Sequence, residues 1–174
     1  MHRRFDHRFV ARILLVFALA TLLAGCGFKL RSNQTFAFET VGITPETGGA
    51  VAAELIRYFG DAVRPVAPGK GEAPPQVIVD ILQEQREKIV VATNASGQVR
   101  EFQLRIKLTF RLRTPWGREL IAPTEISQQR DISFNESLVL AKEFEETLLY
   151  RDMQSDILQQ LLRRLAAVKT LPVQ

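Results

Sequence analysis

Thiol and imidazole groups are scarce in this 174-residue chain. It has one cysteine, Cys26, and two histidines, His2 and His7. A single cysteine excludes an intrachain disulfide. The sequence also contains no G-x-S-x-G, no S-x-x-K and no glycine-rich phosphate loop, so the common motifs for nucleophilic catalysis and phosphate binding are missing.

The first 25 residues have the layout of an export signal. Four arginines between Arg3 and Arg12 precede an apolar run, Ile13 to Leu23, that is too short to span a bilayer. Leu23-Ala24-Gly25-Cys26 follows, in the order that bacterial lipoprotein processing recognises. We predict cleavage before Cys26, which then carries an N-acyl chain and an S-diacylglycerol. The alternative is a buried core helix with a chance cysteine.

Removal of this signal leaves a mature chain without histidine. Imidazole bases, thiolate nucleophiles and ordinary zinc sites are then excluded, and we expect no metal and no cofactor beyond the acyl groups on Cys26. Carboxylate pairs and Ser/Lys pairs remain possible, but no motif spaces them. A lipid- or envelope-modifying hydrolase, with such a site assembled only in three dimensions, is therefore an alternative to a protein that is not an enzyme.

Charge gives little reason to expect a nucleic-acid partner. The signal takes four arginines and one aspartate, so that 19 of 23 basic and 18 of 19 acidic residues remain. The mature chain is close to neutral despite its high overall pI. Its 149 residues suit one domain.

The first half of the mature chain predicts a strand, a helix and a second strand. Residues Phe36 to Ile43 have strand character, and Thr47 can cap a helix that Gly60 ends. A turn-rich connector covers residues 64–75. A long strand follows from about Val77 to Thr93, and the turn signal Asn94 to Gly97 predicts a hairpin.

The clearest pattern in the sequence is a strict alternation of apolar and polar residues between Phe102 and Arg113. It is typical of a strand with one buried face. The other face is basic, through Arg105, Lys107, Arg111 and Arg113. Two interpretations remain open: a solvated face that discourages edge pairing, or a surface that meets an anionic partner.

The last strand and helix complete the pattern. After the turn at Pro115 to Gly117, a weaker strand runs from Glu119 to Phe134, interrupted near Pro123. Asn135 can cap a helix of about thirty residues. Its apolar stripe, expected in the core, is Phe144, Leu148, Leu149, Met153, Ile157, Leu161 and Leu165.

The element order β-α-β-β-β-α predicts an α+β fold. We expect a two-layer sandwich in which a four-stranded mixed sheet is covered by two helices. The expected boundaries are a signal peptide at 1–25, a lipidated tether at 26–35, the folded domain at 36–169 and a tail at 170–174.

Three segments together resemble the LptE family of lipopolysaccharide-assembly lipoproteins. They are Leu23 to Arg31 (LAGCGFKLR), Ser96 to Leu104 (SGQVREFQL), and Leu140 to Glu143 (LAKE) leading to Leu161 to Leu165 (LLRRL). The resemblance implies an outer-membrane, lipid-anchored protein that plugs the LptD β-barrel, helps it assemble and binds lipopolysaccharide. Gly27 after the cysteine, by resemblance to lipoprotein sorting, also points to the outer membrane.

The resemblance places a glycolipid-binding basic residue at Lys142. We expect it to contact a phosphate or carboxylate of lipopolysaccharide, and the β-strand cations Arg105, Lys107, Arg111 and Arg113 are further candidates. Glu145 and Glu146 are close in sequence, Glu146 four residues on, and a surface ion pair explains Lys142 equally well. Another outer-membrane assembly or pilot lipoprotein is the alternative function.

Overall fold

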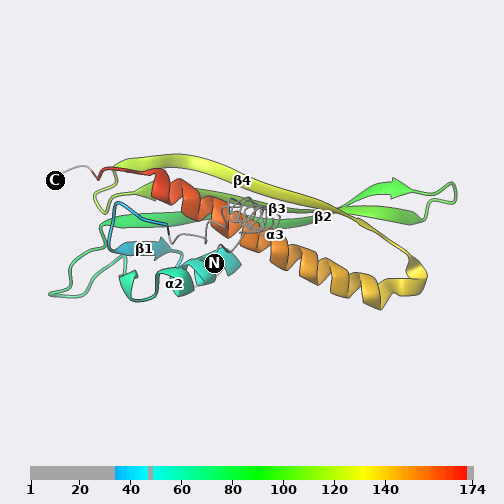
Figure 1. Cartoon of the computed structure of the whole chain (residues 1–174), viewed down its shortest axis with the longest axis horizontal. Coiled ribbons are helices and arrows are strands. Elements are labelled where there is room, and N and C mark those ends of the chain that lie inside the picture. Colours follow the sequence, from blue (N-terminus) through cyan, green and yellow to red (C-terminus); the bar gives the residue numbers. More distant parts are fainter. Residues whose placement is uncertain (1–33, 47–48, 172–174) are drawn as a thin grey trace, which may run out of the picture. The chain divides into compact units, whose positions relative to one another are not determined.

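A computed structural model describes residues 34–46 and 49–171. The described chain is the expected α+β sandwich, with its helices on one side of a four-stranded mixed sheet (Figure 1). The order β-α-β-β-β-α is confirmed. The elements are β1 (Val41–Thr44), α2 (Ala50–Phe59), the short helix η1 (Gly60–Ala62), β2 (Val77–Thr93), β3 (Val99–Arg113), β4 (Glu119–Ser133), the short helix η2 (Glu136–Leu138) and α3 (Val139–Ala167).

The sheet follows the sequence order β1-β2-β3-β4. β1 is parallel to β2, with Val41 opposite Val77, and the other two pairings are antiparallel. In β3 the alternation is confirmed: the apolar residues from Leu104 to Leu112 are buried and the polar residues between them are partly exposed. One face of the sheet is therefore apolar and the other polar.

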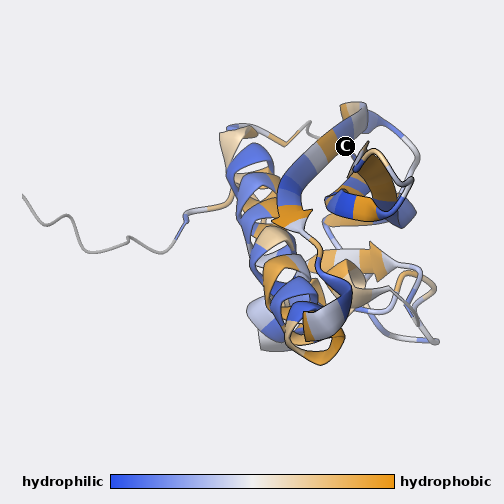
Figure 2. Ribbon diagram, turned by 90° about the vertical axis from the view of Figure 1, so that its right-hand side faces the viewer, coloured by the Kyte–Doolittle hydropathy of each residue, from blue (hydrophilic) through white to orange (hydrophobic). Residues whose placement is uncertain are grey.

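The apolar face packs against the helices to form the core. Leu104, Ile106, Leu108 and Phe110 of β3 are fully buried, and burial of such a side chain contributes ~1.5–3 kcal/mol. The helical side of the core consists of Val51, Ala52 and Leu55 from α2 and Met153, Ile157, Leu161 and Leu165 from α3. Figure 2, an end-on view, shows the long helix on one side of the strands.

The first strand is shorter than expected, beginning at Val41 rather than Phe36. Phe36 instead packs against Phe59 at the end of α2, with ring centroids 5.2 Å apart, because aromatic burial there replaces strand pairing. Thr47, the expected cap, lies outside the described residues. Gly49 is the N-cap, and the backbone N–H of Val51 donates to Glu84 of β2 at 3.2 Å. Gly60 ends α2 as expected.

Two features of the second half match the sequence closely. Pro123 interrupts the β3–β4 pairing as a register shift rather than a break, since Phe110 pairs with Thr124 but Leu112 pairs with Ile121. Asn135 caps η2, its side chain accepting from the Ser137 backbone N–H at 3.0 Å, and α3 follows directly.

The expected core stripe of α3 is wrong at its beginning. Phe144 is 67% exposed and Leu148 is 44% exposed. Phe144 precedes Met153 by nine positions, which at about 100° per residue places the two roughly 180° apart around the helix. The face directed at the sheet near the start of α3 consequently carries the polar residues Lys142 and Glu146.

The sheet has two distinct ends, named here for reference. The hairpin end comprises the β2–β3 turn at 94–98 and the β4–α3 connection at 134–138 (Figure 1, right). The β1 end comprises β1, the connector at 64–75 and the β3–β4 turn at 114–118 (Figure 1, left). Among the described residues, no helix has the length and apolar character needed to cross a bilayer.

Candidate functional site

The basic face of β3 is paired with acidic residues of β2. Glu87 lies 3.5 Å from both Arg105 and Lys107. Asp80 lies 2.6 Å from the Nε of Arg111 and 2.7 Å from that of Arg113. Each of these carboxylates serves two cations, and Arg111 also lies 3.9 Å from Glu119 of β4. The local positive charge is therefore less than half of what the four basic side chains alone provide.

Asp80 is the more tightly held of the two carboxylates. It is buried, and the Thr44 hydroxyl also donates to it at 2.6 Å. Burial raises the pKa of Asp80, but the hydrogen bonds from Arg113, Thr44 and Arg111 outweigh it and lower the pKa below its ordinary value. This network joins β1, β2 and β3 at the β1 end.

No described helix covers the polar face of the sheet, but the connector at 64–75 covers it at the β1 end, where Ile78 is buried and Val66, Pro75 and Ile78 lie around Gly42. α2 and α3 both pack on the opposite, apolar face. The side chains of Arg105, Lys107 and Arg111 are 30–35% exposed. On this face the paired cations lie among polar side chains of β2 and β4. Some are uncharged, such as Gln85 and Ser127 opposite Lys107, and others are acidic, such as Glu125 opposite Thr109.

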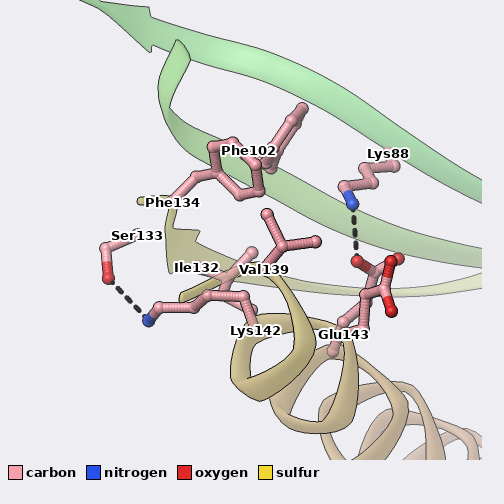
Figure 3. Close-up of a pocket in the computed structure, with 9 residues that line it drawn as sticks. Lys88, Phe102, Ile132, Ser133, Phe134, Val139, Lys142 and Glu143 are labelled. Carbon is pink, nitrogen blue, oxygen red and sulfur yellow. Dashed lines mark hydrogen bonds and ion pairs between the residues drawn. The ribbon is translucent and has the colours of Figure 1, made fainter. Parts of the chain in front are cut away.

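Lys142 lines a cavity of about 220 Å³ at the hairpin end (Figure 3). The apolar part of its wall includes Phe102 and Phe134, whose rings meet edge to face with centroids 5.2 Å apart. The full lining is Lys88, Phe102, Ile132, Ser133, Phe134, Val139, Lys142, Glu143 and Glu146. The cavity thus has an apolar floor and charged groups at its edge.

The ammonium of Lys142 has two neighbours in the described structure. Its Nζ donates to the Ser133 hydroxyl at 2.9 Å and to the Glu145 carboxylate at 2.8 Å. The surface ion pair that is the alternative explanation of Lys142 is present, but its carboxylate is Glu145, because Glu146 turns toward β2. An ammonium has three donors, so one N–H is left without an acceptor among the residues described.

Lys88 is a second cation at this cavity that the sequence did not identify. Its Nζ lies 2.6 Å from Glu146 and 4.4 Å from the centroid of the Phe102 ring, a cation–π distance. The hairpin turn is the sequence signal that could have identified Lys88. When the residues of β2 and β3 are paired outward from the turn at Asn94, Lys88 lies opposite Leu104, on the face that the helices cover. β2 carries both charge signs, so its composition alone did not distinguish Lys88.

The sequence-predicted cations do not form one site. Lys142 lies with Lys88 at the cavity beside α3, whereas Arg105, Lys107, Arg111 and Arg113 lie on the polar face of the sheet. Cys26 lies outside the described residues. Within residues 34–46 and 49–171, no cluster of three or more side chains could hold a metal ion.

Comparison with known proteins identifies the family. The family model described as "LptE: Lipopolysaccharide-assembly" matches residues 32–165. The LPS-assembly lipoprotein LptE of Pectobacterium atrosepticum is 26% identical over 166 residues, covering 88% of this chain and 84% of that protein.

Two solved structures share the fold. The solution structure of lipoprotein B from Nitrosomonas europaea has a TM-score of 0.64 and 37% identity, covering 81% of this chain and 91% of that one. A minor lipoprotein from Acinetobacter baumannii has a TM-score of 0.58 at 17% identity, covering 80% and 99%. The chain therefore belongs to the LptE family of lipopolysaccharide-assembly lipoproteins, which are associated with the outer membrane and are not enzymes.

Proposed function

We propose that this protein, acylated at Cys26 and anchored in the outer membrane, binds lipopolysaccharide at the hairpin-end cavity and is the plug and assembly partner of the LptD barrel. Family membership supports a place in the lipopolysaccharide-transport machinery. The observation that carries the glycolipid contact is the cavity, whose lining combines an apolar floor with the ammonium groups of Lys88 and Lys142 and the carboxylates of Glu143 and Glu146.

Lipopolysaccharide matches this cavity in both of its chemical properties. Its lipid part is apolar, and its phosphates and carboxylates are anionic. Lys142 offers a compact ammonium with a donor to spare, and a lysine binds phosphate as a point charge. The Phe102, Ile132 and Phe134 side chains supply the adjacent apolar surface.

The β3 cations differ in how accessible they are to an anion. Arg111 and Arg113 are held by short hydrogen bonds to Asp80, so an external anion must compete with a buried carboxylate. Arg105 and Lys107 share Glu87 at 3.5 Å, a looser arrangement. Arg105 and Lys107 are the better candidates for contact with lipopolysaccharide or with acidic groups of the barrel.

Two surfaces are available for the barrel. One is the polar face of the sheet, which no described helix covers. The other is a row of exposed apolar side chains at i, i+4 and i+8 on α3, formed by Leu140, Phe144 and Leu148. A stable complex with the barrel is expected to bury at least ~1,000 Å² in total.

The proposal is tested by charge reversal at the cavity. Lys142→Asp is expected to lower binding to purified lipopolysaccharide, while folding and co-purification with LptD are retained. Lys70→Asp, in the exposed connector, is the matched control and should leave binding unchanged. Equal binding by both variants would reject the Lys142 contact, and failure of LptD to co-purify with the wild-type protein would reject the partner.

A further inference from the structure

A tryptophan is held in solvent at the β1 end. Trp116 is 62% exposed in the β3–β4 turn. The turn is well defined, because the Thr114 backbone N–H donates to the Arg118 carbonyl at 2.8 Å and the Gly117 N–H donates to the Thr114 carbonyl at 3.0 Å. Gly117 has a φ of 90°, which favours glycine. A fixed turn therefore presents a large apolar ring to the outside.

The described chain also begins at this end. Phe36 packs against Phe38 and Phe59, in both cases with ring centroids 5.2 Å apart. Val41 pairs with Val77 at the start of β2, and the next residue of β2, Ile78, pairs with Arg113 just before the β3–β4 turn. Gln34, two residues before Phe36, consequently lies at the same end of the sheet as Trp116.

The length of the preceding segment limits how the domain can face a membrane. Seven residues, 27–33, separate Cys26 from Gln34, so the eight backbone steps from Cys26 to Gln34 reach at most ~29 Å when fully extended. β2, with 17 residues, is ~56 Å long. A domain standing with its hairpin end on the membrane would hold Gln34 farther from the surface than this segment reaches.

We propose that the β1 end, with Trp116 as its contact, rests in the phospholipid headgroup region of the leaflet that holds the acyl chains of Cys26. This inference rests on the acylation of Cys26 in the proposed function. The indole ring is amphipathic and is enriched at membrane–water interfaces, where its apolar body is covered and its N–H finds an acceptor. Arg118, exposed two residues along, is placed to meet lipid phosphates.

One consequence concerns the cavity. With the β1 end at the headgroups, Lys142 and Lys88 lie at the opposite end of the sheet, away from the leaflet that holds the anchor.

Trp116 can be observed directly, because it is the one tryptophan of the chain. Acylated protein is reconstituted into vesicles of phosphatidylethanolamine and phosphatidylglycerol, with or without brominated acyl chains, and flotation measures how much is anchored. The expected results are a blue-shifted emission, at least a twofold loss of intensity in brominated vesicles, and protection from iodide.

The control moves the tryptophan to the other end. Trp116→Phe combined with Ser96→Trp places it in the β2–β3 turn, where iodide should quench it and brominated lipid should not. Anchored protein whose Trp116 is unquenched by brominated lipid overturns the inference and leaves the acyl anchor intact. Equal quenching at both positions means that the domain lies flat and also overturns it. Protein that does not float has no acyl anchor, and the inference fails with that premise.

Discussion

The Thr44 hydroxyl donates a 2.6 Å hydrogen bond to the Asp80 carboxylate, joining the short edge strand β1 to β2. The same carboxylate accepts from Arg111 and Arg113 of β3. One buried side chain thus connects three strands at the end of the sheet where the described chain begins.

Asp80→Asn is expected to destabilise the domain by about 3 kcal/mol, the low end of the range for breaking a buried ion pair, because both guanidiniums are partly solvated. Since the folded pKa of Asp80 lies below its unfolded value, its stabilisation is full above about pH 4 and is lost as pH falls through the folded pKa. Urea unfolding from pH 7 to pH 3 measures this. If the variant and wild type keep a constant difference in stability over that range, the assignment to Asp80 is wrong.

Charge reversal on β3 should distinguish cations that stabilise the fold from cations that can bind an external anion. Arg113→Glu breaks two hydrogen bonds to Asp80 and should cost about 3 kcal/mol. Lys107→Glu, at a side chain 32% exposed and 3.5 Å from Glu87, should change stability by less than ~1 kcal/mol. It should instead weaken lipopolysaccharide or LptD binding most strongly at low salt. Similar losses of stability in the two variants would contradict this division.

Removing the carboxylate beside Lys142 should strengthen anion binding. Glu145→Gln frees the ammonium from a partly exposed ion pair worth ~0.2–1 kcal/mol, so affinity for lipopolysaccharide should rise by up to about fivefold. Asp152→Asn removes the same charge from an exposed position farther along α3 and is the control for net charge. An equal rise in both variants would show that only overall charge matters.

Loss of an apolar side chain should be tolerated in the first turns of α3 but not in its later turns. Phe144→Ser, at an exposed position, should change the free energy of unfolding by no more than ~0.5 kcal/mol. Ile157→Ala, at a fully buried position, should cost about 2–5 kcal/mol. Denaturant unfolding compares them, and a loss above 1 kcal/mol for Phe144→Ser would mean that this side chain is packed in solution.

Cys26→Ala should block both acylation and processing, because the thiol is the acceptor of the diacylglycerol. Cells fed a labelled fatty acid should label the wild-type protein but not the variant, and mass spectrometry should find residues 1–25 still attached. A labelled variant, or unlabelled wild-type protein, would reject the anchor.

Local patterns predicted most of the sheet. β2 has the expected bounds, and β3 alternates as expected, because a hairpin turn and a period-two pattern depend on neighbouring residues. The shortened β1 was not predictable in the same way. Phe36 is as apolar as a strand residue, and only the presence of Phe59 in three dimensions gives it a different partner.

The candidate site was predictable only in part. Lys142 stands out in a family motif, but its neighbours Ser133 and Lys88 come from β4 and β2, far away in the sequence. The exposure of Phe144 was not predicted, because side chains spaced four residues apart rotate progressively around a helix that has 3.6 residues per turn. Over several such steps the first side chain no longer faces the core. Ion pairing of the β3 cations depends on strand register, which composition does not contain.

The two lysines of the cavity, each beside its own carboxylate, have a consequence for the kinetics of binding. If lipopolysaccharide binds here as proposed, Glu145 or Glu146 can replace its anionic group on Lys142 or Lys88 as it leaves. Neither ammonium then loses its counterion in a partly apolar setting. Exchange of one counterion for another has a lower barrier than separation of charges. For the proposed binding of lipopolysaccharide, we therefore expect rapid turnover of the ligand more than long residence.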